Sequence, residues 1–268
     1  MAKFLESNLT SAGGFADREG KPDLYYTVFG LEGLLALRKD PSRDQLRTWL
    51  QSFGSGAGLD FVHLCSLARC CADVGGDVLA EETRQVLASR IEAFRTPDGG
   101  YHGTPGKQQG SAYGCLLAWG AYSDLRLAMP DLDRLKACVT KLHMPSGGFA
   151  NEPGLPAGTT STAAAVTLCR HLGLPASVDT AAWLLSQRHP GGGFLAVPNA
   201  PLPDLLSTAV ALHALVSLDA SLDSIRESCL DFIDTLWSAE GGFHGHWADD
   251  HLDCEYTYYG LLALGHLG

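Results

Sequence analysis

Residues 147–172 read GGFANEPGLPAGTTSTAAAVTLCRHL: a Gly-Gly-aromatic triplet, a short polar loop, and a segment dense in small and apolar residues. The triplet recurs four times, at Gly13-Gly14-Phe15, Gly99-Gly100-Tyr101, Gly192-Gly193-Phe194 and Gly241-Gly242-Phe243. The aromatic positions are separated by 86, 48, 45 and 49 residues, and a degenerate copy, SFGSGAG at residues 52–58, falls within the first and longest gap. Self-similarity at a fixed period of this length is the sequence signature of a repeat architecture.

Each triplet lies between two segments of different character. The segments after the triplets are apolar on nearly every side, which is typical of buried helices, and span residues 23–37, 61–73, 111–122, 161–172, 204–218 and 253–266. The segments before them carry charges on one face and span residues 2–8, 44–53, 81–94, 132–142, 180–188 and 224–237. The sequence therefore predicts an all-α fold, an (α/α)6 barrel or toroid of about six helix-pair repeats, in one domain over residues 1–268. We expect the glycines to end each outer helix at positive φ, and the aromatic to fill the gap between the two rings.

The composition restricts the partners of this fold. The chain carries 19 Lys and Arg against 30 Asp and Glu, a net charge of −11, so nucleic acid and anionic lipid are not expected as partners. The N-terminus lacks the apolar core of a signal peptide, and no apolar run approaches the roughly 20 residues of a membrane span. Most of the eight cysteines lie within apolar helical patterns, which indicates reduced, core-packed thiols and a cytoplasmic protein.

Two stretches at opposite ends of the chain resemble a known family. Residues 23–34, DLYYTVFGLEGL, and residues 253–264, DCEYTYYGLLAL, are similar to repeats of the prenyltransferase β-subunit and terpene-cyclase superfamily, and of protein geranylgeranyltransferase β subunits in particular. The resemblance spans essentially the whole chain. It implies a toroid with an apolar central funnel for a long isoprenoid, together with a helical partner subunit or self-association. The side chains expected to bind the substrate are Tyr25, Tyr26, Lys107, Tyr113, Trp247 and Tyr259.

The Thr of the segment after each triplet gives a register for the family's catalytic residues. Protein prenyltransferases carry an Asp four residues before this Thr, a zinc-binding Cys two before it and, in another repeat, a zinc-binding His one before it. Class II terpene cyclases carry an Asp-x-Asp-Asp cluster there, and its Asp two before the Thr protonates the substrate. Counted from Thr257, this chain has Asp253, Glu255 and Tyr256, so the zinc register is not reproduced. The positions of the family's diphosphate-binding basic pair hold His246 and Asp249.

Two chemistries are compatible with residues 244–255, which are dense in His, Asp, Cys and Glu. One is a metal site, with zinc held by His246, Asp253 and Cys254. The other is a proton donor, because carboxylates crowded at the end of a buried helix raise each other's pKa. Glu255 is then the acid, with Asp253 as its orienting partner and Tyr256 beside it. A third interpretation is a capping loop without chemistry, whose acids interact with the helix dipole.

The sequence leaves several functions open. The resemblance favours an isoprenoid-processing enzyme of the prenyltransferase type. The alternatives are a cyclisation of the class II terpene-cyclase kind, started by protonation from Glu255 with Asp253, and a non-catalytic toroid that binds a lipid or a protein. A carbohydrate-active enzyme is a weaker fourth, because paired carboxylates and aromatic residues also occur on α/α barrels. His63 and His213 lie in apolar segments and are expected to be core residues.

Overall fold

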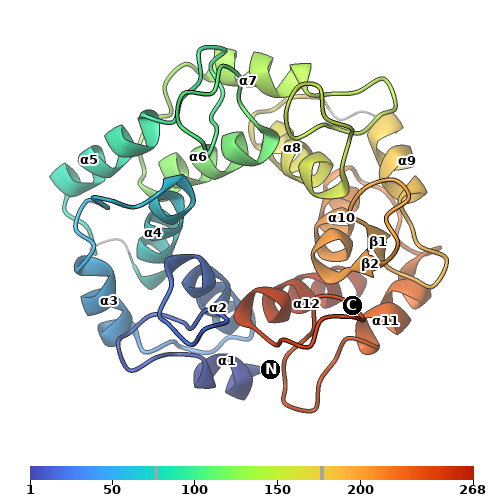
Figure 1. The fold of residues 1–268 in the computed structure, drawn as a ribbon, viewed down its shortest axis with the longest axis horizontal. Helices are drawn as coiled ribbons and strands as arrows, with labels where there is room; N and C mark the ends of the chain where they lie inside the picture. Colours follow the sequence, from blue (N-terminus) through green and yellow to red (C-terminus); the bar gives the residue numbers. More distant parts are fainter. Residues whose placement is uncertain (76–77, 176–177) are drawn as a thin grey trace.

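The computed structural model describes residues 1–75, 78–175 and 178–268, and within them twelve α-helices alternate between an inner and an outer ring (Figure 1). The inner helices are α2 (Leu24–Ala36), α4 (Phe61–Val74), α6 (Ala112–Asp124), α8 (Thr159–His171), α10 (Leu205–Ser217) and α12 (Cys254–Leu267). The outer helices are α1 (Ala2–Ser7), α3 (Arg43–Gln51), α5 (Glu81–Glu92), α7 (Leu132–Lys141), α9 (Val178–Ser186) and α11 (Arg226–Asp234). A short antiparallel hairpin precedes α10 and consists of β1 (Phe194–Leu195) and β2 (Pro203–Asp204).

The inner ring is closed. Each inner helix packs against the next, and α12 packs against α2, so that the last repeat lies beside the first (Figure 1). The outer helices pack on the outside of this ring, which confirms the predicted all-α toroid. Across the described ranges, no helix combines the length and the apolar character that crossing a membrane requires.

The repeated triplet joins the two rings through one hydrogen bond. In four repeats the backbone N–H of the triplet aromatic donates to a Thr Oγ1 on the inner helix that follows. The pairs are Phe15 and Thr27 at 2.9 Å, Phe149 and Thr162 at 2.8 Å, Phe194 and Thr208 at 3.0 Å, and Phe243 and Thr257 at 3.3 Å. In the third repeat the N–H of Tyr101 donates to the Cys115 Sγ at 3.4 Å. The Thr or Cys that accepts this hydrogen bond therefore faces the outer ring. Its position determines which residues of each inner helix face the centre of the ring.

The triplet glycines are required by this turn. The first glycine of every triplet has a positive φ, for example +90° at Gly192, where a Cβ would also overlap the backbone carbonyl oxygen of Ser228 on α11. The five triplet aromatics are between 0% and 8% exposed, and they fill the space between the rings. The positive φ and the filling of the gap by the aromatic are confirmed, but the glycines do not end the outer helices. These helices end six or seven residues earlier, at Ser7, Glu92, Lys141, Ser186 and Asp234, and where a C-cap is described it is a non-glycine residue with right-handed helical φ and ψ.

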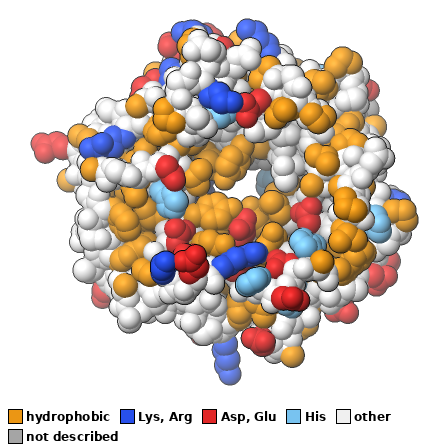
Figure 2. Space-filling view, viewed as in Figure 1, with side chains coloured by type: hydrophobic (Ala, Val, Ile, Leu, Met, Phe, Trp, Pro, Cys, Tyr) orange, Lys and Arg blue, Asp and Glu red, His pale blue; other side chains and the backbone are white. Residues whose placement is uncertain are grey.

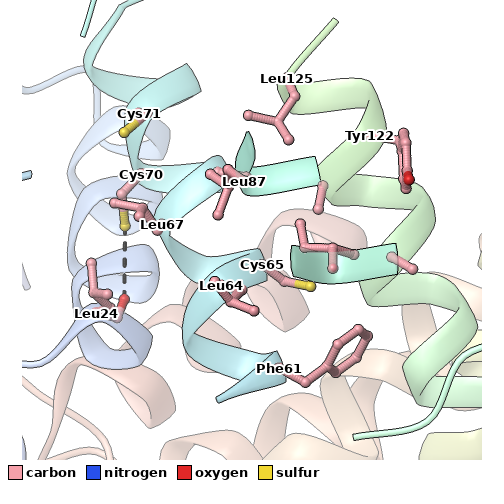
Figure 3. Close-up of a cluster of buried hydrophobic side chains, with 14 of the residues drawn as sticks. Leu24, Phe61, Leu64, Cys65, Leu67, Cys70, Cys71, Leu87, Tyr122 and Leu125 are labelled. Atoms are coloured by element: carbon pink, nitrogen blue, oxygen red, sulfur yellow. Dashed lines mark hydrogen bonds between the residues drawn. The ribbon is translucent and has the colours of Figure 1, made fainter. Parts of the chain in front are cut away.

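The hydrophobic core lies between the rings and not at their centre. Around α4, Phe61 and Leu64 lie among side chains of the neighbouring helices, such as Leu87 of α5 (Figure 3). The Cys70 thiol contacts the carbonyl oxygen of Leu24 on α2 at 3.7 Å. All eight cysteines are free, and seven of them are buried. Because the core fills the space between the rings, the centre of the inner ring is left for a cavity.

Candidate functional site

The amino ends of the inner helices and the loops beside them surround one opening of the ring, which we call the mouth. Its N-cap residues are Asp23, Asp60, Ser111, Gly158, Asp204 and Asp253. Backbone hydrogen bonds tie three of these helix ends to the loop of the next repeat. They run from Ala112 to Asn151 at 2.9 Å, from Thr159 to Ala196 at 2.8 Å and from Leu205 to Gly245 at 2.8 Å. Figure 2 shows charged and histidine side chains gathered over α2 and α12, beside the hollow at the centre.

A cavity of about 780 Å³ lies within the inner ring. Its volume is in the range of about 300–1,000 Å³ that is usual for small-molecule sites. The aromatic lining residues are Tyr25, Tyr113, Tyr258 and Tyr259, and the aliphatic ones include Leu116, Leu155, Leu206, Val210 and Leu262. The polar lining residues are Asn151, Thr160, Ser161, Thr167 and His213. Within the described part of the chain, no Asp, Glu, Lys or Arg lines this cavity, so its wall is largely apolar with a few hydroxyl, amide and imidazole groups.

On each of these inner helices, the Thr or Cys that accepts the hydrogen bond from the triplet aromatic is a reference position from which the cavity-lining residues can be counted. The residues two positions before it line the cavity in four repeats, and they are Tyr25, Tyr113, Thr160 and Leu206. The residues five positions after it line the cavity in three repeats, and they are Thr167, His213 and Leu262. In α12 the residue two before Thr257 is Glu255. Glu255 therefore occupies the cavity-facing register at the mouth.

Glu255 is held against the cavity wall by a tyrosine. The Tyr25 hydroxyl donates to the Glu255 Oε1 at 2.7 Å, and Tyr25 itself lines the cavity. Burial raises the pKa of Glu255 above its ordinary value and the charge of Asp253 adds to this, while the hydrogen bond from Tyr25 acts in the opposite direction. The net shift of the pKa is upward, so the folded protein holds the proton of Glu255 more tightly than a free glutamate does.

Asp253 and Tyr256 lie beside this acid and not in the cavity wall. Asp253 is 3% exposed, caps α12 by accepting the Tyr256 N–H at 2.8 Å, and accepts from Arg18 Nε at 2.9 Å. The Tyr256 ring lies under the Arg18 guanidinium, 5.5 Å from its centroid. Arg18 also pairs with Asp249 at 3.3 Å. Asp253 thus acts first as a helix cap and as the partner of a cation.

The predicted zinc ligands do not converge. Cys254 is fully buried, Asp253 is committed to Arg18, and the Nδ1 of His246 accepts the Ala248 N–H at 3.1 Å. Among the residues that the structure describes, no group of three or more His, Cys, Asp or Glu side chains is arranged to hold a metal. The expected metal site is not supported, because adjacent helical positions point in different directions and Cys254 packs into the core while Glu255 faces inward.

The six residues expected to bind substrate divide into two groups. Tyr25, Tyr113 and Tyr259 line the cavity. Three others lie elsewhere, and they are Tyr26, Lys107 and Trp247. The Lys107 ammonium pairs with Glu152 at 3.0 Å, and Tyr26 lies on the mouth near Arg18. Trp247 is 45% exposed on the outer ring, where its ring packs on Phe232 at 5.5 Å, because the loop after Phe243 turns outward toward α11.

Two histidines expected in the core lie elsewhere. His63 lies between two N-cap carboxylates, with Nε2 3.0 Å from Asp23 and Nδ1 2.8 Å from Asp60, and the bond to Asp23 makes the largest contribution in raising its pKa to about 9. His213 lines the cavity, and its Nδ1 lies 3.1 Å from the Nε2 of His266. Burial lowers the pKa of both His213 and His266. His213 lies five positions after Thr208, and this spacing is the sequence signal that could have placed it in the cavity wall.

A second group of polar side chains lies at the opposite end of the inner ring, and no feature of the sequence predicted it. Arg69 on α4 pairs with Glu32 on α2 at 3.3 Å and with Asp124 on α6 at 2.9 Å. Asp73, one turn after Arg69, keeps one carboxylate oxygen buried with no hydrogen-bond partner. Burial and the nearby Glu32 raise the pKa of Asp73 to about 7. Through Arg69 this group links α2, α4 and α6 at that end of the ring.

Comparisons with known proteins agree with this architecture. The chain matches the model of the prenyltransferase alpha-alpha toroid domain over residues 1–56, 61–181 and 175–267. A comparison with curated proteins finds no match. Protein geranylgeranyltransferase-I of Candida albicans, solved with GGPP, is 15% identical with a TM-score of 0.71, covering 91% of this chain and 83% of that one.

Two other solved structures show that this fold serves different chemistries. The type II terpene cyclase MstE from Scytonema is 13% identical with a TM-score of 0.67, covering 99% of this chain and 94% of that one. An α-1,6-mannanase from Salegentibacter sp. HEL1_6 is 16% identical with a TM-score of 0.66, covering 99% and 97%. At such identities the likeness concerns the fold, and the reaction has to be argued from the site.

Proposed function

The chain belongs to the prenyltransferase α/α toroid family, and we propose that it is an isoprenoid-processing enzyme that holds the hydrocarbon chain of its substrate in the central cavity. The observation that carries this proposal is the 780 Å³ cavity, whose wall has tyrosine rings and aliphatic side chains and no charged group among the described residues. Burial of apolar surface contributes roughly 25 cal/mol per Å², so such a wall favours a long hydrocarbon over a polar ligand.

The cavity fits a sugar less well. Glycosidases use two carboxyl groups on either side of the bond that breaks. Among the carboxyl groups of the described residues, only Glu255 occupies the cavity-facing register at the mouth, whereas Glu32, Asp73 and Asp124 lie around Arg69 at the other end. The mannanase likeness is therefore attributed to the shared toroid.

The reaction that the site favours is protonation of an isoprenoid double bond by Glu255, as in the cyclisation alternative. Three features support it: the position of Glu255 beside the cavity, its raised pKa, and the Tyr25 hydroxyl at 2.7 Å. When the carboxylic acid gives its proton to the alkene, the Tyr25 O–H stabilises the carboxylate that forms. The carbocation is neutralised when a neighbouring carbon gives up a proton to water, and the Glu255 carboxylate takes a proton back from water, so the substrate is rearranged without net gain or loss of atoms and the acid is restored.

Filling the cavity tests the binding proposal. Ala164 lies on the wall, and Ala164→Trp is expected to weaken the binding of a C20 isoprenoid alcohol at least tenfold, because the indole occupies the space of the chain. Thr48→Trp places the same side chain on the exposed face of α3 and serves as the control. Calorimetry measures both affinities, and thermal unfolding reports whether each variant is folded. Equal binding by the two folded variants would place the ligand outside the cavity.

Substituting the acid tests the reaction. Glu255→Gln keeps the size of the side chain and a hydrogen-bonding group for Tyr25, so binding is expected to persist while turnover falls by at least a hundredfold. Glu82→Gln, on an exposed position of α5, is the matched control. Full turnover by Glu255→Gln would exclude Glu255 as the acid. A helical partner subunit or self-association stays a prediction, which the mass of the purified protein in solution measures.

A further inference from the structure

The cations near the mouth already have carboxylate partners. Four sets of residues show this: Arg18 with Asp249 and Asp253, Lys21 with Glu19, His63 with Asp23 and Asp60, and Lys107 and His102 with Glu152. In two of them one cation faces two acids, and in the last Lys107 and His102 share Glu152, so that over the four sets six carboxylates face five basic side chains. An anionic ligand entering here has to compete with these carboxylates for every cation.

The remaining histidines of the mouth are also engaged. The Nδ1 of His244 lies 3.1 Å from the carbonyl oxygen of His251, and the Nδ1 of His246 accepts the Ala248 N–H at 3.1 Å. His251 lies 3.4 Å from the Asp249 carboxylate. These contacts use one nitrogen of each ring, and none of them gathers histidines around a common point.

Acceptors and neutral groups surround the place where a polar end of the substrate would lie. Glu255 adds an acid to the mouth beside the N-cap Asp253, and it has no cation of its own within the described residues. The polar side chains of the cavity wall include Thr160 at the mouth and Thr167 and His213 deeper in, and burial lowers the pKa of His213, which favours its uncharged form. An uncharged head can hydrogen-bond to such groups, whereas a buried anion without a cation is strongly disfavoured.

We propose that the isoprenoid taken by this cavity carries an uncharged hydrogen-bonding head, of the alcohol or phenol class, and not a diphosphate. This inference rests on the proposed function, since it concerns the polar end of the same ligand. A diphosphate carries several negative charges, and its binding needs unpaired Lys or Arg side chains, which the mouth lacks among the described residues. The hydrocarbon chain then supplies most of the affinity, and the head contributes orientation.

The test compares two ligands with the same tail. Geranylgeraniol and geranylgeranyl diphosphate are titrated into the full chain below their micellar concentrations, by calorimetry and by thermal shift. The alcohol is expected to bind at least tenfold more tightly, and the difference is expected to shrink as salt screens the mouth. Tighter or equal binding of the diphosphate overturns this inference and leaves the proposed function intact. Binding of neither ligand overturns the proposed function itself.

A charge substitution at the mouth separates electrostatics from shape. Glu152→Gln removes the carboxylate that pairs with Lys107 and His102, next to the cavity-lining Asn151. It is expected to raise the affinity for the diphosphate severalfold and to leave the affinity for the alcohol unchanged. Asp44→Asn changes the net charge equally on the exposed face of α3 and should alter neither affinity. An unchanged diphosphate affinity in Glu152→Gln would contradict the inference that the mouth's charge selects the head group.

Discussion

Replacing Asp73 by Asn is expected to stabilise the protein above pH 7 and to remove part of the pH dependence of its stability. Asp73 lies at the end of α4, with one carboxylate oxygen buried and without a hydrogen-bond partner. Burial raises its pKa from 3.8 to about 7 and the charge of Glu32 adds to this, whereas Arg69 acts in the opposite direction. Asn resembles the protonated acid in shape and has no charge to bury.

The direction of the effect follows from the two pKa values. Below pH 3.8 the carboxyl is protonated in the folded and the unfolded chain, and it does not change the free energy of unfolding. Between 3.8 and about 7 only the unfolded chain gives up the proton, so the free energy of unfolding falls as the pH rises through this window. One pKa unit corresponds to about 1.4 kcal/mol, which sets an upper value of about 4 kcal/mol, and solvent around the partly buried group reduces this to about 1–3 kcal/mol.

Urea denaturation at about pH 5 and about pH 8 measures the effect. Asp73→Asn should exceed the wild type in free energy of unfolding by about 1–3 kcal/mol at the higher pH, and by less at the lower pH. Asp133→Asn, on an exposed position of α7, is the control and should shift stability little at either pH. If Asp73→Asn is less stable than the wild type at the higher pH, Asp73 is ionised and paired with Arg69 in the folded protein, and the reasoning above is wrong.

Two further predictions concern the turn that joins the rings. Thr208→Val should lower the free energy of unfolding by about 1–3 kcal/mol, because the buried N–H of Phe194 loses its acceptor, whereas Thr48→Val on the surface should cost much less in the same urea titration. Gly192 and Gly106 both have a positive φ, but only Gly192 is packed against backbone atoms. Gly192→Ala should therefore lower the free energy of unfolding by several times the roughly 1 kcal/mol expected for Gly106→Ala. Equal costs at the two glycines would mean that the close approach to α11 is not what requires glycine.

The fold could be predicted because its determinants are local and repeated. A turn with positive φ, a buried aromatic and an apolar helix follow one another within about one repeat, and each can be recognised from the residues themselves. The ends of the helices were less predictable. For example, α8 begins at Thr159 and not at residue 161, because Gly158 takes the N-cap position and the Ser161 side chain bonds back to it.

The candidate site could be predicted only in part, because its contacts join residues far apart in the sequence. The spacing from Thr257 correctly places Glu255 in the register that faces the cavity. It did not show that Asp253 pairs with Arg18, which lies 235 positions away, or that Tyr25 lies 230 positions from the acid it contacts. The same limit explains the zinc prediction: His246 and Cys254 are close in sequence, yet one lies in a surface loop and the other in the core.

The contacts of the proposed acid all depend on the closure of the ring. Tyr25 and Arg18 come from the first repeat, Glu255 and Asp253 come from the last, and α2 packs against α12 along the same boundary. Phe29 of α2 packs between the rings of Tyr258 and Tyr259 at 5.6 and 5.5 Å, so the aromatic side of the cavity spans this boundary as well. An open ring would leave Glu255 exposed, with an ordinary pKa and without its tyrosine. The pairing of the first and last repeats therefore both closes the ring and buries Glu255 beside Tyr25, which is the environment that the proposed protonation requires.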